Sequence, residues 1–172
     1  MDEAICEWAI ESRSPDETLE LARRLGATLQ GGEVVALEGD LGSGKTTFTK
    51  GLCLGLGVTD SRLVSSPTYV LEHVYEGRLR IHHYDAYRLQ GSEELVGLGF
   101  RDHLSPESVL VIEWADRVLD ALPVGCLRVD LSATHAESSG GGNGPSLRRR
   151  VRFFGPSASW AERLQKISAG KG

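Results

Sequence analysis

Apolar residues recur along the chain with two different periods, which separate the expected helices from the expected strands. Residues 34–37 and 109–112 are uninterrupted apolar runs, and short runs of this kind are typical of strands buried on both faces of a sheet. Leu21, Leu25 and Leu29 instead recur at every fourth position, which is the spacing of one face of a helix. Because such strands and helices alternate, the pattern predicts an α/β fold with a mixed, partly parallel central sheet.

Turn and capping residues set the expected limits of these elements. Ser14, Pro15 and Glu17 form a helix start, with a capping hydroxyl, a proline at the first helical position and a capping-box carboxylate. Gly31 and Gly32 end that helix. The expected strands cover residues 5–10, 33–38, 69–75, 79–85, 109–112, 127–131 and 147–154. The other expected helices cover residues 45–56, 92–98, 116–122 and 156–167.

Length and composition favour a single globular domain over residues 1–172. The chain is 40% hydrophobic, which at this length is enough to bury a substantial core without stabilising disulfides or structural metals. No apolar run approaches the roughly 18 residues of a membrane span, and the acidic N-terminal sequence lacks the basic start of a secretory signal. Cys6, Cys53 and Cys126 form no CxxC pair, so we expect buried thiols in a reducing compartment. These features predict a cytoplasmic protein that does not enter a membrane.

The net charge of −5 is unevenly distributed, since residues 147–172 hold seven basic residues and one acidic residue. A basic cluster in this part contains Arg148, Arg149, Arg150 and Arg152. A basic segment on an acidic body can contact RNA or an acidic partner, although charges on a solvated strand and helix explain it equally simply. The glycine-rich residues 138–144 precede the cluster and predict a flexible connection between two hairpin strands.

The strongest chemical signal is the sequence GDLGSGKT at residues 39–46, which matches the phosphate-binding pattern GxxxxGK[ST]. An apolar strand precedes it and a helix follows it, as this loop requires. Glycines allow backbone N–H groups to converge on an anion, and the helix N-terminus adds the positive end of its dipole. We expect Lys45 to contact the β- and γ-phosphates and Thr46 to bind Mg²⁺. The expected nucleotide-binding residues here are Gly39, Asp40, Leu41, Gly42, Ser43, Gly44, Lys45, Thr46 and Thr47.

Two carboxylates follow apolar strand segments and are candidates for the metal and the reacting phosphate. Glu113 directly follows the run 109–112, so its carboxylate is expected at the carboxyl edge of the sheet. Asp85 ends the segment 79–85, and we assign to it a water-orienting or γ-phosphate-sensing role. A surface glutamate and a capping aspartate are the simpler alternatives. Arg88, one turn beyond Asp85, is the only candidate for an arginine that acts on the γ-phosphate.

Two further segments near these acids are ambiguous from sequence. His82 and His83 raise the question of a metal site, but no third ligand lies at a recognisable spacing, so we expect structural histidines. Because alternation along a strand turns them to opposite faces, at most one of them can serve a single site. Residues 65–69 combine small hydroxyls with a proline, which fits either a nucleotide-sensing loop or an ordinary turn before a strand.

Several motifs in a fixed order resemble one family. They are GDLGSGKTTFTKGL, SSPTYVLEHVY, HHYDAYRL, ELVGLGFRDHL and VLVIEW. Together they are similar to the TsaE family, small bacterial P-loop ATPases of tRNA threonylcarbamoyladenosine biosynthesis. The resemblance covers roughly residues 5–165, and its later motifs are more specific than the phosphate loop alone. It implies a P-loop NTPase-like three-layer sandwich.

The resemblance also implies an activity and partners. ATP and Mg²⁺ are the implied cofactors, with ATP hydrolysis that is slow alone and stimulated by partners. The implied partners are homologues of TsaB and TsaD, of which TsaD transfers the threonylcarbamoyl group to the adenosine beside the tRNA anticodon. ATP hydrolysis is implied to reset this complex between rounds of modification. The resemblance gives no basis for deciding whether the chain contacts tRNA itself.

Carried over residue by residue, the resemblance assigns roles within the site. It implies catalytic roles for Lys45, Asp85 and Glu113, with Thr46 and Glu113 at the metal and Asp85 also at the nucleotide. Ser66, Pro67 and Thr68 match a switch-like loop, Trp114 faces the site or a partner, and the adenine lies near residues 14–18. Ala115 departs from the family pattern, in which a proline is common at this position.

Three other functions compete with this interpretation. A small-molecule kinase would bring a basic lid over its acceptor, and no arginine-rich segment lies in the middle of the chain. A GTPase would read guanine through an NKxD-type element, which the lysines at 45, 50, 166 and 171 cannot form. A nucleotide-dependent scaffold that binds ATP and hardly hydrolyses it uses the same binding residues, so sequence leaves it open.

Overall fold

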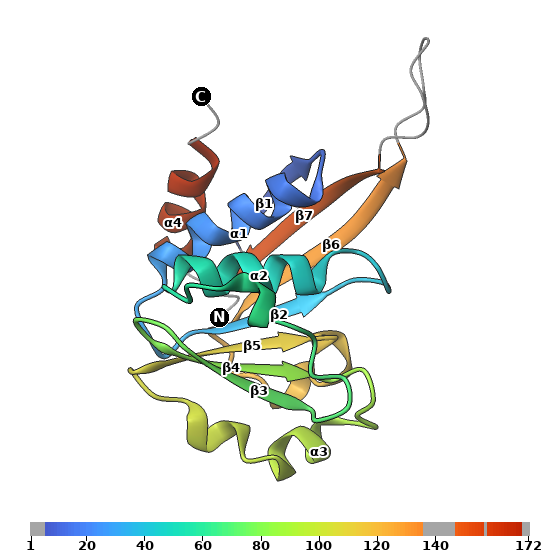
Figure 1. The fold of residues 1–172 in the computed structure, drawn as a ribbon, viewed down its shortest axis with the longest axis vertical. Coiled ribbons are helices and arrows are strands. Elements are labelled where there is room, and N and C mark those ends of the chain that lie inside the picture. The colour runs from blue at the N-terminus through green and yellow to red at the C-terminus, as the bar shows by residue number, and fades with distance from the viewer. Residues whose placement is uncertain (1–5, 136–146, 157, 170–172) are drawn as a thin grey trace.

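The structure, a computed structural model, describes residues 6–135, 147–156 and 158–169 and contains one seven-stranded sheet with helices on both faces (Figure 1). The strands are β1 (Cys6–Ser12), β2 (Val34–Glu38), β3 (Glu72–Glu76), β4 (Arg80–Asp85), β5 (Ser108–Glu113), β6 (Leu127–His135) and β7 (Leu147–Gly155). The α-helices are α1 (Pro15–Thr28), α2 (Lys45–Gly55), α3 (Ser92–Gly97) and α4 (Ala158–Ala169). Short 3₁₀ turns are η1 (Ser61–Leu63), η2 (Phe100–His103), η3 (Ala115–Arg117) and η4 (Leu119–Ala121).

The sheet has the order β1-β7-β6-β2-β5-β4-β3 and is parallel only in its middle. Strands β6, β2, β5 and β4 run parallel to one another, whereas β3 pairs antiparallel with β4, and β7 lies antiparallel between β6 and β1. Glu113 is in register with both Leu37 of β2 and Asp85 of β4. The carboxyl ends of β2, β4 and β5 therefore meet at one edge of the sheet, and the predicted mixed α/β class is confirmed.

Two hydrophobic cores, one on each face of the sheet, give the molecule three layers. Helices α1, α2 and α4 cover one face, with buried leucines such as Leu25, Leu52 and Leu164 packed against the strands. Helix α3 and the turns η2, η3 and η4 cover the other face around Tyr84 and Phe100. Both cores use alternate residues of the same central strands, which is why residues 34–37 of β2 and 109–112 of β5 are apolar without interruption.

The start of α1 follows from its capping residues. Ser14 Oγ accepts a hydrogen bond from the Glu17 N–H at 3.1 Å, and Pro15 occupies the first turn. The Glu17 carboxylate accepts a hydrogen bond from the Arg13 N–H at 2.8 Å, one residue before the position expected of a capping box. The predicted helix start is confirmed, and it places the first turn of α1 directly after β1.

Two expected elements differ from the structure. The strand expected over 69–75 begins only at Glu72, because Leu71 has φ 68°, which an extended strand cannot continue. The helix expected over 116–122 is absent, and η3 and η4 take its place. Val118, at φ −138°, separates these two turns. The helix does not form because the burial of Val118 and Ala115 in the second core outweighs the helix propensity of this short segment.

Other sequence expectations concern buried thiols, the hairpin and the surface. Cys53 and Cys126 are buried free thiols, whereas the Cys6 side chain and the glycine-rich residues 138–144 lie outside the described residues. Strands β6 and β7 pair antiparallel, as predicted for the two hairpin strands.

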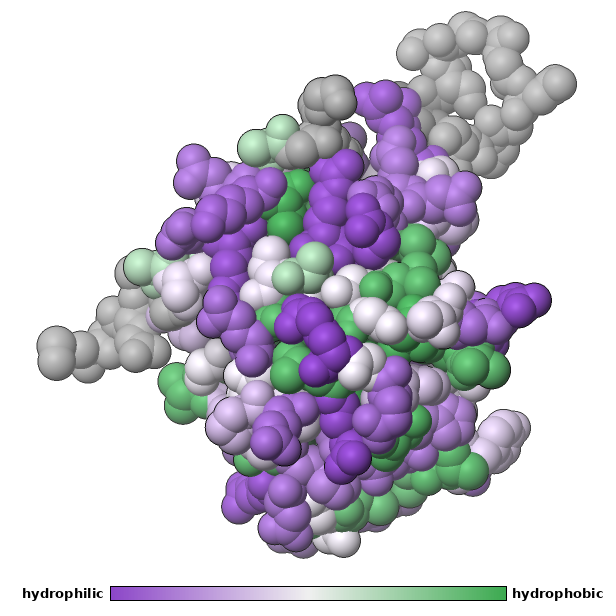
Figure 2. Space-filling model, turned by 60° about the vertical axis from the view of Figure 1, so that its left-hand side comes forward, coloured by the Kyte–Doolittle hydropathy of each residue, from purple (hydrophilic) through white to green (hydrophobic). Residues whose placement is uncertain are grey.

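No described helix combines the length and apolar character needed to cross a membrane. Figure 2 shows a face on which apolar and charged side chains are interspersed.

Candidate functional site

The loop between β2 and α2 is shaped by three glycines in left-handed conformations. Gly39, Gly42 and Gly44 have φ values of 138°, 76° and 107°, which residues with a Cβ rarely adopt. Gly44 is the N-cap of α2 and makes no side-chain capping bond. The first N–H groups of α2 therefore point outward without a cap, an arrangement suited to binding an anion.

Lys45 folds back over the loop that precedes it. Its Nζ donates hydrogen bonds to the carbonyl oxygens of Gly39 at 2.5 Å and Asp40 at 2.8 Å, and lies 3.7 Å from the ring centre of Trp114. Burial of the ammonium lowers the pKa of Lys45 from its usual value, and the nearby Glu113 carboxylate opposes this effect. A phosphate group would offer this cation a stronger partner than the two carbonyls.

Glu113 is a buried carboxylate held from three sides. Thr46 Oγ1 donates to its Oε2 at 3.2 Å, and Thr49 Oγ1 donates to its Oε1 at 3.3 Å. The Nε2 of His83, itself fully buried, lies 2.9 Å from the same Oε1. The structure thus brings together Thr46 and Glu113, the two expected metal ligands, and it adds His83 and Thr49 as partners that sequence reasoning did not assign. The hydroxyl and carboxylate oxygens are the hard donors that Mg²⁺ prefers.

Asp85 connects the sheet edge to the segment 65–69. Its Oδ2 accepts hydrogen bonds from Ser66 Oγ at 2.5 Å and Thr68 Oγ1 at 2.9 Å, and its Oδ1 accepts one from the Tyr87 N–H at 2.8 Å. The carboxylate is buried, so these bonds compensate its loss of water. The arrangement orders the hydroxyl-bearing loop next to the phosphate loop, and Asp85 caps its own following turn as well.

These side chains line one cleft of about 460 Å³ at the carboxyl edge of the sheet. Its walls comprise Leu41, Gly42, Gly44, Lys45, Thr46, Thr47, Ser66, Thr68, Asp85, Tyr87, Glu113, Trp114 and Arg149. Gly39, Asp40 and Ser43 belong to the same loop but do not line the cleft, and Asp40 is exposed. Two buried polar atoms beside the cleft, Ser43 Oγ and Arg149 Nη1, have no hydrogen-bond partner among the residues that the structure describes. Such orphan donors fit a ligand rich in acceptor oxygens.

Sequence reasoning gave no role to two residues that line the cleft, Tyr87 and Arg149, and one of its candidates, Arg88, does not line it. Arg149, which the sequence placed in a basic cluster, donates from Nε to the Ser43 carbonyl oxygen at 2.9 Å. Arg88 is exposed and is not among the residues lining the cleft, and its guanidinium lies 5.2 Å from the ring centre of Tyr69.

The neighbouring His82 belongs to a separate cluster on the other face of β4. Glu72 Oε1 lies 2.7 Å from His82 Nδ1 and 3.2 Å from His103 Nδ1, which brings the third group that the sequence spacing did not reveal. The two imidazole rings stack with centres 4.0 Å apart. Rings that bind one tetrahedral zinc through in-plane nitrogens are splayed to roughly 5 Å or more. In this conformation His82 is hydrogen-bonded to Glu72 and stacked on His103, and His103 Nδ1 lies 2.6 Å from the Tyr84 hydroxyl.

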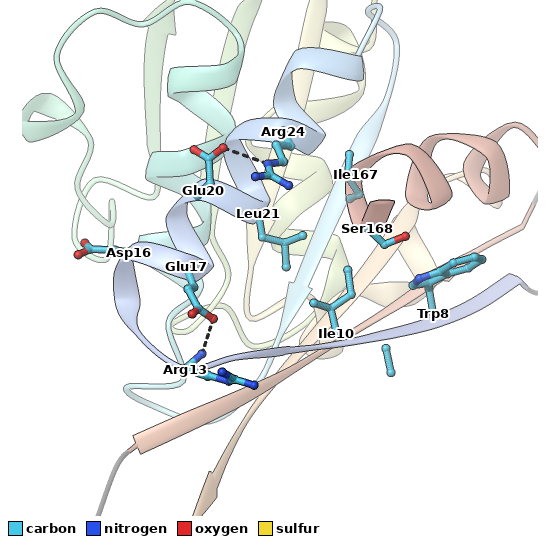
Figure 3. Close-up of a pocket in the computed structure, with 11 residues that line it drawn as sticks. Trp8, Ile10, Arg13, Asp16, Glu17, Glu20, Leu21, Arg24, Ile167 and Ser168 are labelled. Carbon is cyan, nitrogen blue, oxygen red and sulfur yellow. Dashed lines mark hydrogen bonds and ion pairs between the residues drawn. The ribbon is translucent and has the colours of Figure 1, made fainter. Parts of the chain in front are cut away.

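A larger hollow of about 620 Å³ lies between β1, α1 and α4 (Figure 3). Trp8, Ile10, Leu21 and Ile167 supply apolar surface, and charged groups near the start of α1 form its rim. Of the residues 14–18, for which an adenine contact is predicted, Asp16 and Glu17 line this hollow, and none lines the cleft at the phosphate loop. The adenine contact therefore stays a prediction.

Comparisons with known proteins agree on the family. The family model described as "Threonylcarbamoyl adenosine biosynthesis protein TsaE" matches residues 12–140. A tRNA threonylcarbamoyladenosine biosynthesis protein TsaE from Treponema pallidum is 41% identical over 120 residues, which cover 70% of this chain and 87% of that protein. The protein of the same name from Streptomyces coelicolor is 36% identical over 156 residues, covering 88% and 99%.

A solved structure supports the same assignment. The crystal structure of YdiB from Bacillus subtilis matches with a TM-score of 0.75 and 27% identity, and the match covers 98% of both chains. The two chains therefore share one fold over almost their whole lengths. The chain is a member of the TsaE family of threonylcarbamoyl adenosine biosynthesis proteins.

Proposed function

We propose that this protein is a Mg²⁺-dependent ATPase that serves the threonylcarbamoyladenosine modification of tRNA. One observation carries the proposal: the phosphate loop, Lys45, Glu113 and Asp85 converge on a single cleft. A loop with uncapped N–H groups and a lysine binds phosphates, and two buried carboxylates beside it provide for a metal ion and a water molecule. The TsaE family assignment connects this nucleotide chemistry to tRNA modification.

On this proposal the residues around Lys45 hold the nucleotide. Lys45 would exchange the carbonyl oxygens of Gly39 and Asp40 for phosphate oxygens, and the first N–H groups of α2 would bind the same anion. Thr46 and Glu113 would hold Mg²⁺, and His83 would orient the Glu113 carboxylate. When bound, Mg²⁺ neutralises charge on the β- and γ-phosphates.

Asp85 has the position of a group that senses the reacting end of the nucleotide. It ties Ser66 and Thr68 to the edge of β4, so any ligand that competes for its oxygens also moves that loop. Asp85 would orient the attacking water, and the loop would change its order when the γ-phosphate is lost. This coupling also favours a second candidate function, a nucleotide-dependent switch with negligible hydrolysis.

The proposed partners are homologues of TsaB and TsaD, with tRNA as the substrate of the assembled complex in the cytoplasm. Support comes from large apolar side chains exposed around the cleft, including Leu41 at 85% and Tyr69 at 86% exposure, with Val70 and Tyr87 beside them. Apolar groups gathered at the mouth of a charged cleft are typical of a surface that another protein covers.

The test is ATP hydrolysis with Mg²⁺, measured for the protein alone and with the TsaB and TsaD homologues of its own organism. We expect slow turnover alone and strong stimulation by the pair. Tight ATP binding without turnover in either mixture would exclude the ATPase and favour the switch. Absence of nucleotide binding would exclude both functions.

Variants assign the roles. Lys45→Ala should abolish turnover, Glu113→Gln should lose Mg²⁺-dependent turnover while retaining some nucleotide affinity, and Asp85→Asn should bind ATP but hydrolyse it poorly. Lys50→Ala in the same helix and Glu76→Gln on β3 are matched controls, because neither side chain lines the cleft. Full turnover in Lys45→Ala would contradict its phosphate role.

A further inference from the structure

Arg149 is separated from its basic neighbours by the alternation of a strand. Along β7, Arg149 shares its face with Val151 and Phe153, both buried in the first core, whereas Arg150 points to the other face and pairs with Glu11. Arg149 itself is only 8% exposed. A buried guanidinium is costly unless it meets an anion or acceptors for all its N–H groups.

The guanidinium of Arg149 lies on the backbone of the phosphate loop. Its Nε donates to the Ser43 carbonyl oxygen at 2.9 Å, and a Cβ on Gly44 would come within 2.9 Å of the same nitrogen. A side chain at position 44 would therefore displace the arginine. Of the remaining donors, Nη1 is buried without a hydrogen-bond partner, and no ion pair of Arg149 is found among residues 6–135, 147–156 and 158–169. One donor is thus used on the loop and another is left without an acceptor.

The position of β7 determines which part of a nucleotide this donor can meet. In the sheet, β7 lies on the opposite side of β2 from β4 and β5, which carry Asp85 and Glu113. The reacting γ-phosphate belongs to the side of these acids. Arg149 flanks the loop on the other side, next to Ser12 and the start of α1. It is therefore placed for the part that ATP and ADP have in common.

We propose that Arg149 is a nucleotide-binding residue that fixes the phosphate loop through the Ser43 carbonyl and donates a second hydrogen bond to a phosphate oxygen shared by ADP and ATP. This inference rests on the proposed nucleotide function. It differs from an arginine finger, which acts on the γ-phosphate alone and changes turnover. It also removes Arg149 from any RNA-binding surface, because the side chain is buried.

The experiment measures the affinities of ADP and ATP by calorimetry, with Mg²⁺, for the wild type, Arg149→Gln, Arg149→Lys and the control Arg150→Gln. Loss of a charge-assisted hydrogen bond should weaken both nucleotides by a similar factor, about 10- to 100-fold, in Arg149→Gln. Arg149→Lys should retain part of the affinity, since it keeps the charge but not the two-point geometry. Arg150→Gln should bind both nucleotides like the wild type.

Other outcomes overturn the inference. Unchanged affinities in Arg149→Gln would show that the orphan donor meets no phosphate. Loss of turnover with normal ADP binding would make Arg149 a γ-phosphate residue instead. Thermal unfolding without nucleotide shows whether Arg149→Gln merely loses stability. If it does, the nucleotide affinity of Arg149→Lys decides whether Arg149 binds a phosphate. Wild-type affinity in Arg149→Lys would then contradict the proposal. If the wild type binds neither nucleotide, the proposed function fails. If the wild type binds both nucleotides and Arg149→Gln binds them equally well, only the role of Arg149 fails.

Discussion

Adjacent histidines on β4 face different surroundings, because successive side chains of a strand point to opposite faces. His83 is fully buried and contacts the Glu113 carboxylate, and its Nδ1 finds no hydrogen-bond partner within the described part of the chain. His82 contacts Glu72 and stacks on His103 in the separate cluster. Only His83 can therefore influence the proposed metal and nucleotide site.

Replacing His83 should change the Mg²⁺ requirement, whereas replacing His82 should not. Groups that orient a ligand typically contribute 10- to 100-fold to metal affinity, so His83→Leu should raise the Mg²⁺ concentration for half-maximal ATP turnover by about that factor. His82→Leu is the matched control, one residue away on the same strand. Equal Mg²⁺ requirements in the two variants would remove His83 from the site.

Burial raises the pKa of the Cys53 thiol to about 12, so the folded protein keeps it protonated. In a variant with Cys6→Ser and Cys126→Ser, Cys53 should not react with a thiol reagent at pH 8 until the protein unfolds. The folded state binds this proton more tightly than the unfolded chain, whose thiol has a pKa of about 8.5. Stability should therefore fall as the pH rises from about 8.5 towards 12. Rapid labelling of the native protein would contradict the burial.

At the scale of elements, α1 and α2 approach closely because glycines face the contact. A Cβ at Gly51 would lie 2.3 Å from the Leu19 carbonyl oxygen, and one at Gly55 would lie 2.1 Å from the Arg23 carbonyl oxygen. Both neighbours are backbone atoms of α1, which cannot rotate away. The helix that begins at the phosphate loop is thereby held firmly against α1.

Gly55→Ala should therefore lower stability, although alanine is the better helix former. Overpacking of this kind costs about 1–3 kcal/mol, which exceeds the gain of roughly 1 kcal/mol from helix propensity. Gly97→Ala in α3 is the control, since a Cβ there meets nothing within 4 Å, and it should be neutral or stabilising. Denaturant unfolding of both variants measures the difference, and a stabilised Gly55→Ala would contradict the close packing.

Much of this arrangement could be predicted from sequence wherever the signal was local. The apolar runs of β2 and β5, the cap at Ser14 and the phosphate loop are each written in a few adjacent residues. The segments around Leu71 and Val118 were predicted wrongly because tertiary contacts there override propensity: a loop tied to Asp85 in one case and burial in the second core in the other.

The candidate site divides in the same way. Lys45, Thr46, Asp85 and Glu113 follow motifs, and the structure places all four on the cleft. Arg149 belongs to no local motif and contacts a residue 106 positions earlier. One signal in the sequence pointed to it nevertheless: the alternation of β7 makes it the charged residue on a face otherwise occupied by Val151 and Phe153.

For the whole molecule, the cleft is assembled from the β2–α2 loop, β4, β5 and β7, so a ligand bound there connects distant parts of the sheet. ADP with Mg²⁺ at about 100 times its Kd should stabilise the fold by about 2.7 kcal/mol. For a chain of this size that corresponds to a rise in Tm of roughly 5–10 °C. Thermal unfolding with and without ADP measures it, and Lys45→Ala should show little rise. An equal rise in that variant would place the ligand elsewhere.

Strand β1 has a consequence for how the protein is made. Within the described residues it pairs only with β7, with Cys6 opposite Gly155. During translation the ribosome releases β1 early and β7 late. For most of that time β1 has no strand to pair with, and the phosphate loop lacks its contact with Arg149. Closure of the sheet and completion of the proposed nucleotide site then occur in the same late step. A nascent chain that stops before β7 carries the entire phosphate-binding motif without the finished site.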